Sequence, residues 1–235
     1  MEDIIKSSSI NNRKIVIEIR YEPNPTVIDN RGLLVKKIID ANLIHNAQWE
    51  LGIGEIKISD SLKASNSKQI IYADLHRLSI ISAKKETNAS FTHFYDRVLK
   101  IFKEVIPSFT IIRIGCRIQG TYDTRSNDYS QLLNNFKSLF PSQFLLDDFN
   151  VNDLRFQLNY QNGHYQIGPV GKDDIFLKTE FPFDDVNTNI GFAIDTDNYV
   201  IRSKEKSIIN DNVIKDVFLT SISVEKSLFE KLNSL

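Results

Sequence analysis

The amino-acid sequence predicts an α+β fold in which antiparallel or mixed sheets pack against helices. Some segments alternate apolar and polar residues, which is the two-residue period of strands with one buried face. Other segments repeat apolar residues every three or four positions, as amphipathic helices do. The two kinds of segment follow one another without the regular alternation of a doubly wound parallel sheet, so α+β is favoured over α/β.

The first part of the chain predicts two strands, a helix and a loop. Residues 14–21, KIVIEIRY, alternate apolar and polar side chains and predict a strand. Two prolines follow, and then apolar residues at helical spacing predict a helix over residues 30–43. Residues 49–58 contain two glycines between apolar residues, which predicts a strand with a bend. Residues 59–68 are polar and predict a loop.

The middle of the chain contains the clearest helix. Phenylalanine and other apolar residues repeat at helical spacing over residues 91–105, and Pro107 ends the pattern. Before this helix, residues 69–84 predict two strands or one long bent strand. After it, residues 110–120 predict a strand with an unusually polar face, and residues 129–140 predict a third helix.

The last part of the chain opens with a β-hairpin. Alternation over residues 154–168 is interrupted by Asn162-Gly163, the strongest turn signal in the sequence. Two strands and two helices are predicted after the hairpin, over residues 174–180, 190–195, 212–219 and 224–232. A boundary near residue 122 would divide the chain into two α+β regions, 1–122 and 123–235, with a single domain as the alternative.

Composition indicates a soluble globular protein without a strongly charged surface. The chain has 235 residues, 41% of them hydrophobic, which is enough for one large core or two modest ones. Its 29 basic and 30 acidic residues give a net charge of -1, so nucleic acid or an anionic membrane would have to bind through a local patch. A single cysteine excludes an internal disulfide framework, and the start of the chain lacks the pattern of a signal peptide. We expect a cytoplasmic protein that does not span a membrane.

Four segments carry a resemblance to a known family. They are KIVIEIRYEP, FTIIRIGCRIQG, IGFAIDTDNY and VIKDVFLTSISVEKSLFEKL. Together they resemble a sporadically distributed family of uncharacterised bacterial proteins over nearly the full length of the chain. That family has an Arg-Gly-containing middle strand and a late strand that ends in an aspartate pair, which Arg113, Gly115, Asp195 and Asp197 match. The resemblance implies a bacterial origin and patchy occurrence, in contexts such as defence cassettes, and it supplies no activity or catalytic residues.

Arginines on several predicted strands form the first candidate binding surface. Arg113 and Arg117 are four residues apart on one strand, so they share a face and lie about 13 Å from each other. Arg20 and Arg77 on neighbouring strands would extend them into a basic strip. Such a strip suits a phosphate backbone or the acidic side chains of a partner protein.

The same arginines also have a purely structural interpretation. Glu18 lies in the predicted strand 14–21, and Asp74 lies within residues 69–84. If these strands are neighbours of the arginine-bearing strands, cross-strand ion pairs with Glu18 or Asp74 would neutralise the strip. The nearly neutral charge of the whole chain favours this interpretation.

The sequence predicts no metal and no cofactor. Asp195 and Asp197 share a strand face and are weak candidates for a divalent cation, but the residues that follow do not fit a calcium loop. The four histidines are scattered, and Cys116, which we expect in the core, has no cysteine partner for a zinc site. Gly52 and Gly54 lack the third glycine and the lysine of a phosphate-binding loop.

These observations favour a non-catalytic protein-interaction component of a bacterial accessory system, defence systems among them. The expected partner is another protein, with a second copy of the chain as an alternative. Two other functions stay open. One is a nucleic-acid-associated protein that uses the arginine-bearing sheet face, and the other is an enzyme whose site forms only in the folded chain, with no catalytic residue recognisable beforehand.

Overall fold

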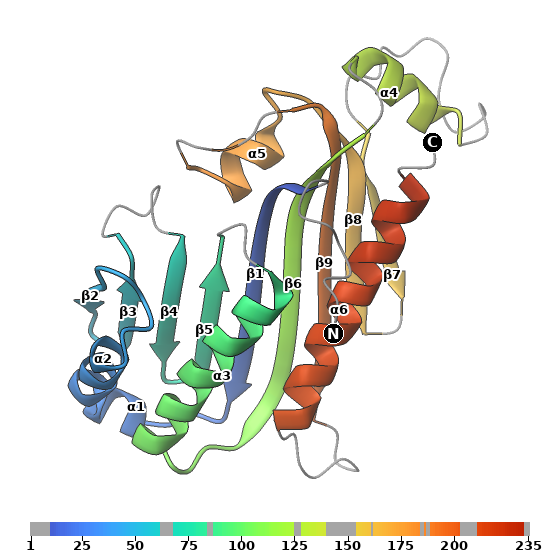
Figure 1. Ribbon diagram of the computed structural model, residues 1–235. Helices are drawn as coiled ribbons and strands as arrows, with labels where there is room; N and C mark the ends of the chain where they lie inside the picture. The colour runs from blue at the N-terminus through green and yellow to red at the C-terminus, as the bar shows by residue number, and fades with distance from the viewer. Residues whose placement is uncertain are drawn as a thin grey trace.

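The computed structural model describes residues 10–61, 68–83, 87–124, 128–139, 154–160, 162–183, 186, 189–202 and 211–232. Its centre is a nine-stranded sheet in the order β2-β3-β4-β5-β1-β6-β9-β8-β7 (Figure 1). Every neighbouring pair of strands in this sheet is antiparallel. The predicted α+β class is therefore confirmed, in its antiparallel form.

The bounds of the elements are as follows. The strands are β1 (Ile10–Tyr21), β2 (Gln48–Leu51), β3 (Glu55–Ser59), β4 (Gln69–Asp74), β5 (Arg77–Ser82), β6 (Ile111–Asp123), β7 (Phe156–Tyr160), β8 (Gly163–Val170) and β9 (Gly191–Ile201). The helices are α1 (Thr26–Asp29), α2 (Arg31–Asp40), α3 (Asn88–Val105), α4 (Tyr129–Lys137), α5 (Ile175–Glu180) and α6 (Asp211–Leu232).

The order of elements repeats once along the chain. β1 is followed by α1 and α2, a meander from β2 to β5, and α3, whereas β6 is followed by α4, the strands β7 to β9 with α5 inserted between β8 and β9, and α6. In each half the first strand pairs with the last strand of its own meander, β1 with β5 and β6 with β9. The two first strands pair with each other at the centre of the sheet. The topology therefore has an approximate two-fold symmetry about an axis between β1 and β6. The second half of this arrangement begins with β6, whereas the predicted boundary, residue 122, falls at the end of that strand.

The main core lies between the sheet and helices α2, α3 and α6 (Figure 1). Alternate residues of β1 and β6 point to this side, and Ile17 and Cys116, which are direct partners across the two strands, are each 1% exposed. Phe91 and Phe102 of α3 are fully buried against them. The expectation that Cys116 belongs to the core is confirmed.

The opposite face of the sheet is covered at one end by α5. Phe176 and Leu177 of this helix pack on Ala193 of β9, which points away from the main core. The central strands between α5 and the other end of the sheet present polar side chains, and we call this part the open face. No helix among the described residues is both long enough and apolar enough to cross a membrane.

Two segments predicted as strands differ in the structure, because one contains a turn and the other is a helix. Residues 49–58 are not one bent strand: the chain reverses, and β2 and β3 pair as a hairpin. The N–H of Gly52 donates to the carbonyl of Glu55 at 3.0 Å and closes the turn. Residues 174–180 form α5 rather than a strand, because the Asp174 side chain accepts a hydrogen bond from the N–H of Phe176 at 2.8 Å and caps the helix.

The two helices predicted at the end of the chain are one continuous helix, α6. The polar residues between them do not interrupt it, since the Ser221 hydroxyl donates to the Val217 carbonyl one turn earlier at 2.9 Å. Ile222 is also buried in the main core, which favours an unbroken helix there. Residues 140–153, which include a predicted connection between the two regions, and residues 62–67 of the predicted polar loop lie outside the described residues.

Candidate functional site

The candidate residues lie on the open face of β1 and β6. Alternation along β1 places every second side chain there, opposite the core-facing isoleucines. Antiparallel pairing with β6 then sets which residues stand side by side. Four cross-strand pairs result, Lys14–Gln119, Val16–Arg117, Glu18–Gly115 and Arg20–Arg113.

Three arginines surround Glu18 at one end of this face. Glu18 Oε1 accepts hydrogen bonds from Arg20 Nε at 2.7 Å and from Arg113 Nη1 at 3.1 Å, and its Oε2 lies 3.7 Å from Arg77 Nη1. Asp74 accepts a hydrogen bond from Arg77 Nε at 3.0 Å. Arg77 reaches the cluster because β5 pairs with β1 and places it opposite Arg20. The expected ion pairs with Glu18 and Asp74 are therefore present.

A second charged cluster lies at the other end, where α5 meets the sheet. Arg117 makes a two-pronged contact with Asp195, with Nε to Oδ1 at 3.0 Å and Nη2 to Oδ2 at 2.6 Å. Lys14 Nζ donates to Glu180 Oε2 at 2.6 Å. Burial alone would raise the pKa of Glu180, but hydrogen bonds from Lys14 and Gln119 and the charge of Arg117 outweigh it and lower the pKa. Glu180 is thus ionised at neutral pH and fastens the end of α5 to β1.

Asp197 lies between the two clusters. Its Oδ2 is 3.6 Å from Arg113 Nη2, and the Arg113 guanidinium stacks on the ring of Tyr199 at 4.8 Å from the ring centroid. Loss of water around the carboxyl raises the pKa of Asp197, although the charges of Arg113 and Arg117 act in the opposite direction. A half-buried carboxyl of this kind is suited to receive a further hydrogen bond from a ligand.

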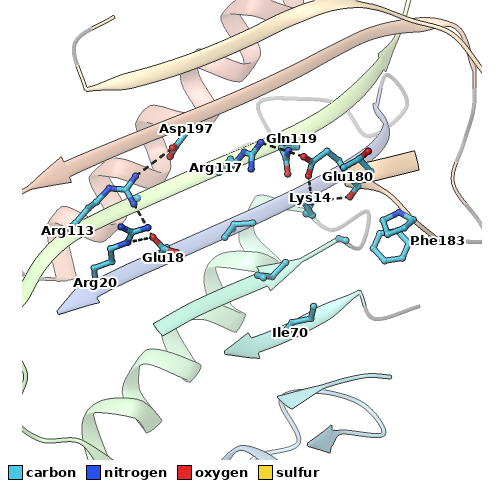
Figure 2. Close-up of a pocket in the computed structure, with 16 residues that line it drawn as sticks. Lys14, Glu18, Arg20, Ile70, Arg113, Arg117, Gln119, Glu180, Phe183 and Asp197 are labelled. Atoms are coloured by element: carbon cyan, nitrogen blue, oxygen red, sulfur yellow. Dashed lines mark hydrogen bonds and ion pairs between the residues drawn. The ribbon is translucent and has the colours of Figure 1, made fainter. Parts of the chain in front are cut away.

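A groove connects the two clusters along β1 and β6 (Figure 2). It has a volume of about 440 Å³ and runs from Arg20 and Arg113 to residues 179–183, which we call the strap. Gly115 lies in the middle of its floor, and an added Cβ there would come within 3.3 Å of the Arg113 guanidinium. A second hollow of about 270 Å³ adjoins the groove and shares Arg117 and Asp197 with it.

The four predicted arginines all lie on this face, but they do not form one basic strip. Arg20, Arg77 and Arg113 gather at Glu18, whereas Arg117 lies four residues further along β6 and pairs with Asp195. Acidic side chains separate and balance them. The arrangement is therefore a row of alternating charges.

The two aspartates that were weak candidates for a metal site contact arginines instead. Arg117 holds Asp195, and Arg113 is the near neighbour of Asp197. Within the described ranges of the chain, no group of three His, Cys, Asp or Glu side chains could hold a metal ion.

The sequence did not predict the strap or its lysine partner. Residues 174–180 resemble a strand in composition, so the helix that carries Glu180 to the open face was missed, although Asp174 is a recognisable N-cap residue. Lys14 had a visible signal, because it is in phase with Glu18 and Arg20 in the alternation of β1.

The groove is suited to binding charged and apolar groups together. Among the described residues that line it there is no Ser, Cys or His, so it offers no nucleophile with an adjacent imidazole base.

No protein-family model matches the chain, and no curated protein matches it. The resemblance to a sporadically distributed bacterial family therefore stays a prediction.

Proposed function

We propose that the protein is a non-catalytic interaction component that binds an extended segment of another protein in the groove. The length of the groove along β1 supports this proposal. Lys14 and Arg20 lie near its two ends and are six residues apart on β1, a distance of about 20 Å at about 3.3 Å per residue. An extended segment of about six residues would fill this length. A role in a bacterial accessory system, such as defence, rests on the family resemblance alone.

The charges of the open face favour a protein segment over nucleic acid. Among the described residues in or beside the groove, five basic side chains form ion pairs, Lys14, Arg20, Arg77, Arg113 and Arg117, and Lys68 lies over the ring of Phe183. Five acidic residues pair with them, Glu18, Asp74, Glu180, Asp195 and Asp197. A surface that neutralises phosphates needs an excess of positive charge, which this balance does not supply. A polypeptide with charges of both signs is complementary to such a surface.

Substitution of Gly115 offers a way to obstruct the groove while keeping the fold. The backbone at this glycine does not have a positive φ, so a side chain is compatible with it. Valine favours strands, and the nearest atoms that its Cβ would meet belong to the flexible end of Arg113. Gly115→Val is therefore expected to fold normally and to fill the middle of the groove.

The test begins with capture of the tagged full-length protein from its native host at moderate salt, and with identification of stoichiometric partners by mass spectrometry. The partner is then purified, and its affinity for each variant is measured by calorimetry. We expect Gly115→Val and the double variant Arg113→Glu/Arg117→Glu to bind at least about tenfold more weakly than the wild type.

A matched control separates the groove from general charge effects. Lys36→Glu/Lys226→Glu makes the same change in net charge and also breaks two ion pairs, with Asp40 and Glu230, on exposed helix surfaces. This control is expected to bind like the wild type. A partner that binds all variants equally, or recovery of nucleic acid in place of a protein, would contradict the proposal.

A further inference from the structure

Beside the Lys14–Glu180 ion pair, the end of the groove next to the strap carries a row of apolar side chains. Ile81 of β5 stands between Val16 of β1 and Ile70 of β4, so three branched side chains form a row on the open face. All three are partly exposed. Phe183 of the strap lines the same end (Figure 2). An accessible apolar row within a polar face is favourably covered by another apolar side chain, because water is released.

The other end offers an arginine with hydrogen-bonding groups directed to solvent. The Arg20 side chain is 50% exposed, and its contact with Glu18 is made through Nε. A guanidinium has five N–H donors in a planar fork, so the terminal nitrogens of Arg20 can take a carboxylate in a two-pronged contact. Arg113 and Arg77 lie around the same Glu18 and strengthen the attraction for an anionic group.

The register of β1 fixes the distance between these two ends. Val16 and Arg20 are four residues apart on one face, which corresponds to about 13 Å. The Arg20 guanidinium folds back to Glu18, which is two residues, or about 7 Å, from Val16. In an extended segment, side chains two or four positions apart point to the same side and cover these distances, whereas neighbours three apart point to opposite sides.

From this geometry we infer that the bound segment carries a large apolar residue and an acidic residue two or four positions apart. The apolar side chain covers the row of Val16, Ile81 and Ile70 at the end of the groove that Phe183 also lines, and the carboxylate binds Arg20. The inference rests on the proposed binding of a protein segment, since it specifies the chemistry of that segment.

A displayed library of random ten-residue peptides, panned against the full-length protein, tests the motif without knowledge of the natural partner. Binders that are also retained by Gly115→Val are removed by counter-selection. We expect the remaining peptides to be enriched in pairs of one large apolar and one acidic residue at separations of two or four. Enrichment of basic peptides, or of apolar residues without an acidic one at these separations, would overturn the inference.

A double-mutant cycle with one enriched peptide then assigns each residue to its place. Arg20→Gln is expected to weaken binding about three- to tenfold, and the peptide's acidic residue changed to its amide should cost the same, with little further loss when both changes are combined. Ile70→Gln in the protein and alanine at the apolar position of the peptide should each weaken binding about tenfold or more. Combining these two changes should again add little further loss. Additive losses would contradict the assigned contacts.

Two checks keep the outcomes distinguishable. Thermal melting verifies that Ile70→Gln is folded, and Ile81→Gln probes the same row from the next strand in case it is not. If the natural partner binds and depends on Gly115 while no peptide shows the motif, the motif is wrong and the proposed function stands. If the groove variants bind the natural partner as tightly as the wild type does, the proposed function is wrong, and the motif that rests on it is wrong as well.

Discussion

A buried ion pair joins the first strand to the last helix, and breaking it is expected to destabilise the fold strongly. Arg13 of β1 contacts Glu225 of α6 twice, with Nε to Oε1 at 3.0 Å and Nη2 to Oε2 at 2.7 Å. The two side chains are 4% and 0% exposed. Arg13 Nη1 also donates to Asn88 Oδ1 at 2.6 Å, and the Tyr122 hydroxyl donates to Glu225. Each charge is thus compensated without water.

The variant Glu225→Leu removes the acceptor and leaves the Arg13 guanidinium and the Tyr122 hydroxyl inside the protein without it. Removal of one partner of a buried ion pair costs about 3 to 5 kcal/mol, because the remaining charge is uncompensated. The double variant Arg13→Met/Glu225→Leu removes both charges. It should retain a loss of about 1 to 3 kcal/mol, since the buried hydroxyl of Tyr122 still lacks the acceptor that Glu225 provides. The double variant is therefore expected to be more stable than the single one.

Equilibrium unfolding in urea, followed by far-UV circular dichroism, measures these differences, provided that the m-values agree between variants. Leu232→Ala, at the end of the same helix, serves as a control for loss of packing without loss of charge. The reasoning fails if Glu225→Leu costs less than about 1 kcal/mol, the value of an exposed pair, or if the double variant is no more stable than Glu225→Leu.

Three further predictions concern single side chains. Burial raises the pKa of the Cys116 thiol to about 12, so iodoacetamide at mildly alkaline pH should label it after unfolding but not in the native protein, as mass spectrometry would show. Desolvation raises the folded-state pKa of Asp197, so its favourable contribution is present in acid and is lost as the pH rises through that pKa. Asp197→Asn should therefore raise the melting temperature at neutral pH and change it little in acid, and the opposite pattern would refute this. Asp174→Ala removes the cap of α5 and the ion pair of Asp174 with Arg155, so it should cost at least about 1 to 2 kcal/mol and speed amide exchange in that helix; unchanged exchange would contradict the role of the cap.

The sequence predicts the elements that have a strong period and misses those that depend on their surroundings. The alternation in β1 and the phenylalanine spacing in α3 identify these elements correctly, because each buries one face against the core. α5 has six residues, too few for a helical period to appear. Its helical state depends on the cap at Asp174 and on packing against β9. Neither of these is visible in the hydrophobic pattern of the six residues themselves.

The candidate site could be predicted only in part, because strand order is not visible in the sequence. The shared face of Arg113 and Arg117 follows from their spacing, and the pairing of arginines with Glu18 was foreseen as a structural alternative. The contact between Arg117 and Asp195 requires β6 to pair with β9, a choice made by the whole sheet. The strap adds Glu180 from yet another part of the chain. Sites assembled by long-range pairing of this kind emerge only with the fold.

The two-fold topology explains why the groove lies where it does and why its two ends differ. Tyr21 and Tyr122 are both fully buried near the ends of β1 and β6, the first strands of the two halves. Counted back from these tyrosines, Val16 of the first half corresponds to Arg117 of the second, and these two residues are direct partners at the centre of the strand pair. A groove between identical halves would accept a segment in either direction. With an aliphatic residue on one side and a paired arginine on the other, the two directions differ in energy, so a bound segment is expected to take one of them.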